Sequence, residues 1–195
     1  SATGTLYYYC IATYNSGGCT TATSNIAQVI VNPIQTITTQ PLASQDICSG
    51  GTIAPLTVAY TDGVGTATYQ WYNNTTNANT GGSSISGANG SSYTPPVFNI
   101  VGDYYYYAMV SLSGSGCGSV ASATALVRVV PDPTVTITPS SQTICQNTTP
   151  TNLVVTPSGG VGTFSYQWYS NTTNNTTTGT SLGASATSAT YTPLT

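Results

Sequence analysis

The stretch VGTATYQWYNNTT at residues 64–76 returns almost unchanged as VGTFSYQWYSNTT at residues 161–173, 97 residues further along the chain. Cys48 and Cys145 are separated by the same 97 residues. Similarity at a fixed period is the signature of a repeat architecture, so the repeat organises the rest of the chain. Inside the stretch, aromatic and polar residues alternate, which is the pattern of a half-buried β-strand.

The beginning of the chain also aligns with a later segment. GTLYYYCIATYNSGGC at residues 4–19 matches GDYYYYAMVSLSGSGC at residues 102–117, at an offset of 98. IAQVIVNP at residues 26–33 matches TALVRVVP at residues 124–131 at the same offset. We therefore expect the chain to open on the end of a repeat.

The matches predict three parts with a repeat length of 97–98 residues. They are residues 1–33, the C-terminal strands (F and G) of one repeat; residues 34–131, a complete repeat; and residues 132–195, the N-terminal strands (A to E) of the next. If a copy of the chain followed Thr195, Cys145 would stand 69 residues before Cys19, as Cys48 stands 69 before Cys117. The implied partners are copies of this chain, joined end to end in one tandem polypeptide or by strand exchange between subunits.

The repeat has the composition of an all-β fold. Helix formers are scarce, while Thr, Val, Ile and Tyr abound. Strands are expected at residues 36–39, 56–60, 69–71, 91–94, 104–112 and 119–130. About seven short strands in such a length are typical of an immunoglobulin-like β-sandwich. The expected core residues are Leu56, Val58 and Trp71, with their counterparts Leu153, Val155 and Trp168. The proline-rich link at residues 131–133 predicts a semi-rigid rod or filament.

Charge is nearly absent from the chain, and this excludes several classes of function. There is one Arg, there are four Asp residues, and His and Lys are missing. One cation cannot neutralise a nucleic-acid backbone, and no apolar run reaches the ~20 residues that a membrane helix needs. Acid–base catalysis lacks its usual side chains, and the carboxylates are not clustered as a metal site requires. We expect a non-enzymatic protein with no metal, no cofactor, no nucleic-acid partner and no membrane insertion.

Five cysteines suggest a disulfide framework. The common 69-residue spacing predicts a Cys48–Cys117 disulfide at one end of the sandwich, and a bond from Cys145 to Cys19 of the adjoining copy. Closing a loop of that size would stabilise a repeat by roughly 4 kcal/mol. Cys10 aligns with Ala108, so a buried free thiol is expected there. Disulfides imply an oxidising, extracellular location.

The order of these motifs resembles a known group of proteins. ICSGG, YQWYNNTT, SSYTPP, YYYYAMVSLSGSGC and SATALVRVVP follow one another as in the tandem immunoglobulin-like repeats of giant cell-surface proteins of Bacteroidota. In that group the repeats form stalks of adhesins, including gliding-type adhesin filaments exported by the type IX system. The resemblance implies an immunoglobulin-like fold, a cell-surface or secreted location and a structural role.

Three functions are compatible with these features. The leading hypothesis is a structural repeat segment of an extracellular bacterial surface filament or adhesin stalk. The second is a carbohydrate-binding module array, in which exposed tyrosines stack on surface glycans. The third is a set of spacer repeats in a secreted enzyme whose catalytic domain lies elsewhere.

Overall fold

The computed structural model describes residues 2–13, 15–18, 20–114 and 116–193. The described residues form β-strands, turns and loops, and they contain no helix. The prediction of an all-β protein is therefore confirmed. Three regions are used below: the N-terminal hairpin (residues 4–31), the central region (residues 34–131) and the C-terminal region (residues 132–193).

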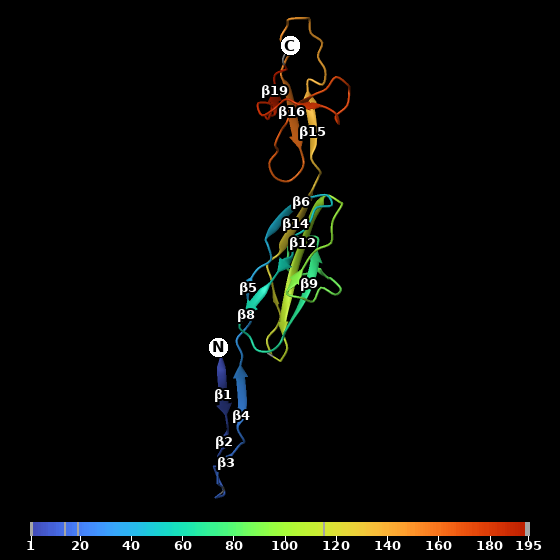
Figure 1. The fold of residues 1–195 in the computed structure, drawn as a ribbon. Coiled ribbons are helices and arrows are strands. Elements are labelled where there is room, and N and C mark those ends of the chain that lie inside the picture. The colour runs from blue at the N-terminus through green and yellow to red at the C-terminus, as the bar shows by residue number, and fades with distance from the viewer. Residues whose placement is uncertain (1, 14, 19, 115, 194–195) are drawn as a thin grey trace. The chain divides into compact units, whose positions relative to one another are not determined.

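The N-terminal hairpin is a long two-stranded ribbon (Figure 1). Strand β1 (Gly4–Tyr8) pairs antiparallel with β4 (Ala27–Val31), so that Gly4 faces Val31. Further along, β2 (Ile11–Ala12) pairs with β3 (Ala22–Thr23). A two-stranded ribbon buries little apolar surface, and every described residue of β1 is exposed.

The central region contains a six-stranded sheet. Its strands are, in spatial order, β10 (Ser83–Ser84), β9 (Ala67–Asn74), β12 (Gly102–Leu112), β14 (Ala125–Val130) and β6 (Ser44–Cys48), with β13 (Val120–Ala121) attached to β12. The pair β9 and β12 is antiparallel over eight residues, from Tyr105 opposite Asn74 to Leu112 opposite Ala67. Strand β14 alternates buried and more exposed residues, and β12 does so from Ala108 to Leu112, as expected when one face covers a core. At Tyr106 and Tyr107 consecutive residues of β12 are buried, so both faces are covered there.

Two short strand pairs complete the central region. They are β11 (Ser92–Tyr93) with β7 (Leu56–Thr57), and β5 (Thr36–Thr39) with β8 (Ala59–Thr61). Tyr93 of β11 lies against Trp71 and Tyr106 of the large sheet, with both pairs of ring centres 5.9 Å apart. The core between these strands is built from fully enclosed side chains that include Leu56, Trp71 and Val127.

The C-terminal region has fewer and shorter strands. A three-stranded sheet joins β15 (Thr134–Thr138), β16 (Leu153–Ser158) and β19 (Thr190–Tyr191), and a separate pair joins β17 (Tyr169–Ser170) to β18 (Thr180–Ser181). Large apolar side chains stay exposed here, among them Val135, Val161 and Phe164.

The described chain divides into two compact units by its contacts. One comprises residues 1–45, 53–96 and 103–127, and the other comprises residues 46–52, 97–102 and 128–195. Strands β6, β12 and β14 have residues in both units.

Candidate functional site

The C-terminal region lacks two strands that its aligned counterpart possesses. In the central region β9 has eight residues, whereas its counterpart β17 has two. Strand β6 occupies residues 44–48, whereas the aligned residues 141–145 form no strand. Strand β9 is held by β12 and strand β6 by β14. The sequence counterparts of β12 and β14 lie in the N-terminal hairpin, as β1 and β4. Each shortened or missing strand is therefore one whose hydrogen-bonding partner aligns with residues 1–33.

The loop that follows the aligned tryptophan is built in the same way in both regions. The Trp71 indole N–H donates to Gly90 O at 2.9 Å, and that of Trp168 donates to Ser188 O at 2.8 Å. The backbone N–H of Trp71 donates to Ala88 O, and the backbone N–H of Trp168 donates to Ala186 O. These contacts join residues about 20 apart, so they form without the distant strands. In the C-terminal region the loop around Trp168 is thus already folded, while no further strands cover this surface.

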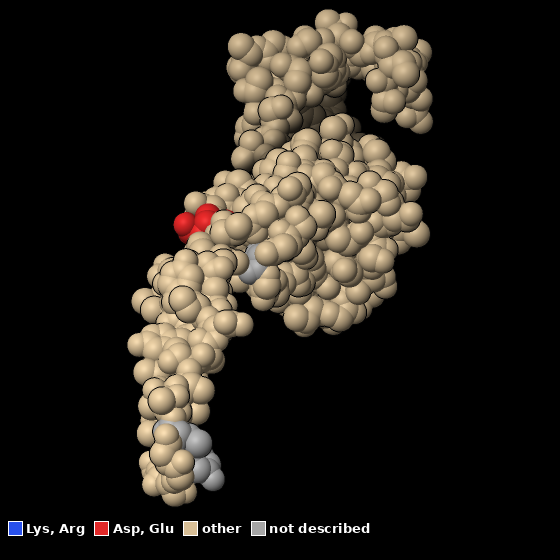
Figure 2. Space-filling model, turned by 90° about the horizontal axis from the view of Figure 1, so that it is seen from below, with Lys and Arg blue, Asp and Glu red and all other residues tan. Residues whose placement is uncertain are grey.

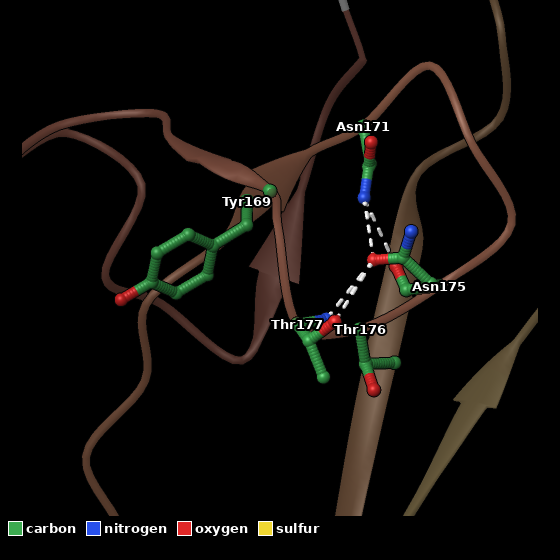
Figure 3. A pocket seen from close by; sticks show the side chains of 6 residues that line it. Tyr169, Asn171, Asn175, Thr176 and Thr177 are labelled. Carbon is green, nitrogen blue, oxygen red and sulfur yellow. Dashed lines mark hydrogen bonds between the residues drawn. The ribbon is translucent and has the colours of Figure 1, made fainter.

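An open hollow of about 300 Å³ lies on this surface. Its lining residues are Tyr169, Asn171, Asn175, Thr176, Thr177 and Gly179. Figure 3 shows Asn171 donating from Nδ2 to Asn175 Oδ1 (3.0 Å). Asn175 Oδ1 in turn accepts the backbone N–H of Thr177. The amide side chains are therefore occupied in bracing the loop, while Tyr169 presents an exposed ring beside it.

In the central region the corresponding place is filled by Tyr107. Its ring stacks on Tyr72, with ring centres 5.0 Å apart and planes inclined by 6°. Its hydroxyl oxygen accepts the backbone N–H of Gly82 at 3.2 Å. A Cβ atom on Gly82 would lie 2.9 Å from the Tyr107 ring and 2.5 Å from Asn73 O, so only glycine leaves room. Tyr72 and Gly82 align with Tyr169 and Gly179, two of the residues that line the hollow.

The residue that aligns with Tyr107 is Tyr9, beside the end of β1. Tyr107 is 3% exposed and Tyr9 is 63% exposed. On the paired strand, Val127 is fully buried while its counterpart Val29 is 45% exposed. The side chains that would fill the hollow and cover the sheet are therefore present in the chain, displayed on the N-terminal hairpin.

The surface around these regions is almost uncharged. On the face shown in Figure 2, acidic side chains occupy one small area and the rest of the described surface carries no charge. Among the described residues, no group of three or more His, Cys, Asp or Glu side chains lies together as a metal would need. The described part of the chain has no helix with the length and apolar character needed to cross a membrane.

Burial differs between the two sets of predicted core residues. Leu56, Val58 and Trp71 are buried in the central region. Their counterparts in the C-terminal region are only half-buried, and they are Leu153, Val155 and Trp168. Sequence reasoning did not single out Tyr9, Tyr169 or Gly179. Their offsets of 97 or 98 from Tyr107, Tyr72 and Gly82, respectively, were the available signal.

The cysteines do not lie as expected within the central region. Cys48 has a free thiol and is the last residue of β6. Two residues further on, Gly50 N–H donates to Phe98 O, which places this end of β6 near the start of β12. Cys117 lies in the loop after β12, and its Sγ contacts Pro33 O at 3.7 Å. Strand β12 spans about 34 Å, whereas the Cα atoms of a disulfide lie within ~7 Å. Strand β6 thus carries Cys48 to the end of the sheet opposite Cys117, and the Cys48–Cys117 disulfide stays a prediction that this geometry disfavours.

The remaining cysteines are placed as follows. Cys145 has a free, exposed thiol, and Cys19 lies outside the described residues. Cys10 also has a free thiol, but it is exposed rather than buried as predicted. Its counterpart Ala108 is fully enclosed opposite Trp71 in the β9–β12 pair. The prediction of burial assumed a covering strand that the hairpin lacks here.

Comparison with protein families gives one match. Residues 37–131 and 134–195 match the family described as a domain of unknown function (DUF8696), and the chain belongs to that family. Among curated proteins, no sequence matches this chain.

Proposed function

We propose that the chain is a non-catalytic structural segment of an extracellular bacterial surface filament or adhesin stalk. Its repeats are immunoglobulin-like β-sandwiches, and they are arranged in series. The N-terminal hairpin of one copy supplies the last two strands of the repeat that begins in the C-terminal region of another copy. The two copies are either consecutive in one polypeptide or separate subunits.

The observation that carries the proposal is the hollow beside Tyr169. Two of its lining residues, Tyr169 and Gly179, are the counterparts of Tyr72 and Gly82, which hold Tyr107 in the central region. Tyr9 of a second copy has the matching ring, and its seat needs no charged group. The predicted register follows from the central region, where Tyr107 faces Tyr72 and Ala108 faces Trp71. In the composite repeat Tyr9 faces Tyr169, and Cys10 faces Trp168 and becomes buried.

The energetics favour this pairing. Aromatic pairs contribute about 0.5–1.5 kcal/mol beyond the apolar area that they bury. Covering the exposed Tyr8, Tyr9 and Val29 removes apolar surface from water at roughly 25 cal/mol per Å². Pairing also satisfies open strand edges, which otherwise promote uncontrolled aggregation.

The alternative of carbohydrate binding has one observation in its favour. The hollow combines an exposed tyrosine ring with Asn and Thr side chains, as many sugar sites do. The Asn171 and Asn175 side chains are, however, engaged within the loop, and the same site in the central region is filled by protein. A glycan array with the assembled protein separates the two functions, because assembly fills the hollow and abolishes binding there.

The test is the assembly of the purified protein. We expect sedimentation and electron microscopy to show concentration-dependent chains of particles, and Tyr9→Ala to shorten them severely because the hollow stays empty. The matched control is Tyr7→Ala in the adjoining strand β1, because its counterpart Tyr105 is only half-buried. A wild-type protein that stays monomeric at every concentration, or equal effects of the two variants, would contradict the proposal.

A further inference from the structure

The two cysteine positions of a repeat lie next to the links that join it to its neighbours. Strand β6 is hydrogen-bonded to β14, and Leu126 N–H donates to Ala43 O at 3.0 Å. The two strands run parallel. If they were antiparallel with Ala43 opposite Leu126, most of β6 would lie beyond Ala125, where β14 begins, and could not pair with it. Advancing five residues along each strand places Cys48 beside residues 130–131. Adjacent strands are about 4.8 Å apart, so Cys48 lies against the last residue of the repeat.

Cys117 lies against the corresponding residue of the preceding repeat. Its Sγ is 3.7 Å from Pro33 O, and Pro33 is the counterpart of Pro131. The loop is held in place by Gln35, which is 1% exposed and donates from Nε2 to Gly118 O. In the central region one cysteine therefore flanks the proline at the end of its own repeat, and the other flanks the proline at the end of the repeat before it.

From this placement we propose that the disulfides join consecutive repeats and do not close within one repeat. Cys48 pairs with Cys19 of the following copy, and Cys145 pairs with Cys117 of the following copy. The inference rests on the proposed serial arrangement of copies. In that arrangement the two cysteines at each link flank the same proline, and the bond requires their Cα atoms to come within ~7 Å of each other.

The cysteine spacing in the sequence is equally compatible with this pairing. In a continuous array Cys48 and Cys19 of the next copy are 166 residues apart, and Cys145 and Cys117 are 167 apart. When equivalent cysteines are paired in the same way along a repeat protein, the number of residues between the partners is nearly the same in every pair, whichever pairing is chosen. Equal spacing alone therefore cannot choose between bonds within repeats and bonds between repeats, whereas the position of β6 can.

The chemistry of bond formation is a two-electron oxidation. The two thiols lose their protons and one electron each, and one S–S bond forms between the two sulfur atoms. The electrons pass to a disulfide of the thiol-oxidant class, which is reduced to a dithiol by exchange through a mixed disulfide. Such oxidants act in extracellular and envelope compartments, where the proposed filament resides.

The result would be a rod in which each proline-containing link is also bridged covalently. A bond within a repeat strengthens that repeat but leaves neighbouring repeats connected by the proline-containing link alone. A bond across the link restrains bending and carries tension even if one sandwich unfolds. Cys10 takes no part, since its counterpart is Ala108 and it faces Trp168 in the composite repeat.

The test is non-reducing peptide mapping of the assembled native protein by mass spectrometry. We expect linked peptides that contain Cys48 with Cys19 and Cys145 with Cys117, while Cys10 reacts with alkylating reagent after unfolding. Linked peptides containing Cys48 with Cys117 or Cys145 with Cys19 would overturn the inference, as would full alkylation of all five cysteines. In the second of these cases, rods in the same sample would show that the proposed function survives, and their absence would show that both fail.

Variants sharpen the test. Cys48→Ser should free Cys19 and leave the Cys145–Cys117 bond intact, and Cys117→Ser should free Cys145 alone. Under a scheme of bonds within repeats, Cys48→Ser would free Cys117 instead. Cys10→Ser is the matched control and should change no linked peptide.

Discussion

The central and C-terminal regions share much of their sequence, yet only one of them closes into a complete core. Hairpins and loops between residues close in sequence form in both, as the matched contacts of Trp71 and Trp168 show. The strands that depend on a distant partner form fully only in the central region. Strand β9 owes its eight residues to β12, and β17 has two because no such partner adjoins it. In this protein a long strand thus forms only where a second strand pairs with it.

The two regions also differ in how many aromatic rings pack together in their cores. The stack of Trp168 on Tyr191, with ring centres 5.4 Å apart, reproduces the contact of Trp71 with Tyr93. What the C-terminal region lacks is the third ring, which Tyr106 supplies in the central region. Its counterpart Tyr8 lies exposed on the hairpin. The C-terminal region therefore has part of the aromatic core already in place, and in the proposed assembly a second copy would supply the missing ring.

The largest expected effect comes from removing the aligned tryptophans. Trp71→Ala should lower the free energy of unfolding of the central region by about 3–5 kcal/mol, because the side chain is fully buried. Trp168→Ala should cost clearly less in the unassembled chain, where the ring is half-buried. Urea unfolding followed by hydrogen exchange of peptides from each region measures both costs.

Assembly should remove that difference between the variants. Once Tyr8 and Tyr9 of another copy cover Trp168, its truncation should cost about as much as that of Trp71. If the cost of Trp168→Ala is the same at low and high protein concentration, the C-terminal region is not completed by a second copy.

Sequence reasoning identified the repeat, the all-β class and most of the longer strands of the central region, because these depend on local periodicity and turn residues. Leu56, Val58 and Trp71 could be chosen as core residues because alternation predicts which face of a strand is buried. Residues 119–130 were expected as one strand, and the structure has β13 and β14 separated by residues 122–124, which form no strand.

The position of Cys48 in the sheet could not be obtained in that way. The sequence contains no signal for β6, a short strand that crosses to β14 and takes Cys48 to the far end of β12. Likewise, the hollow beside Tyr169 could not be predicted from local sequence, and the proposal for its occupant comes from the filled counterpart around Tyr107. Long-range strand pairing decided both features, and local patterns do not contain it.

A smaller effect is expected at alkaline pH. Burial, with a lesser contribution from neighbouring tyrosines, raises the pKa of Tyr106 well above the ordinary value of 10. The folded central region therefore retains a proton that the unfolded chain releases above about pH 10. Its stability should be constant below that pH and should fall as the pH rises from 10 toward the folded-state pKa.

Calorimetry of wild type, Tyr106→Phe and Tyr105→Phe between pH 7 and 11 checks this. A phenylalanine side chain cannot ionise, so Tyr106→Phe should lose much of the alkaline decline in melting temperature. Tyr105→Phe should keep it. Parallel declines in all three proteins would mean that burial of Tyr106 does not link folding to pH.

The smallest expected effect is that of salt on assembly. A dissociation constant that does not increase with salt would indicate that charged groups do not hold the copies together. The contact proposed between copies consists of tyrosine rings, aliphatic side chains and strand hydrogen bonds, and the whole chain has a formal net charge of −3. Raising the ionic strength from about 0.01 M to 1 M shortens the screening length from roughly 30 Å to 3 Å. This change removes only weak repulsion between copies, so the dissociation constant should stay constant or decrease slightly.

Guanidinium chloride at equal ionic strength should dissociate the same chains, because it solvates apolar and peptide groups. Both titrations are run under reducing conditions, so that covalent links between repeats do not hide the result. Dissociation by sodium chloride would show that charged groups hold the copies together, and the hollow filled by Tyr9 would then not be the principal contact.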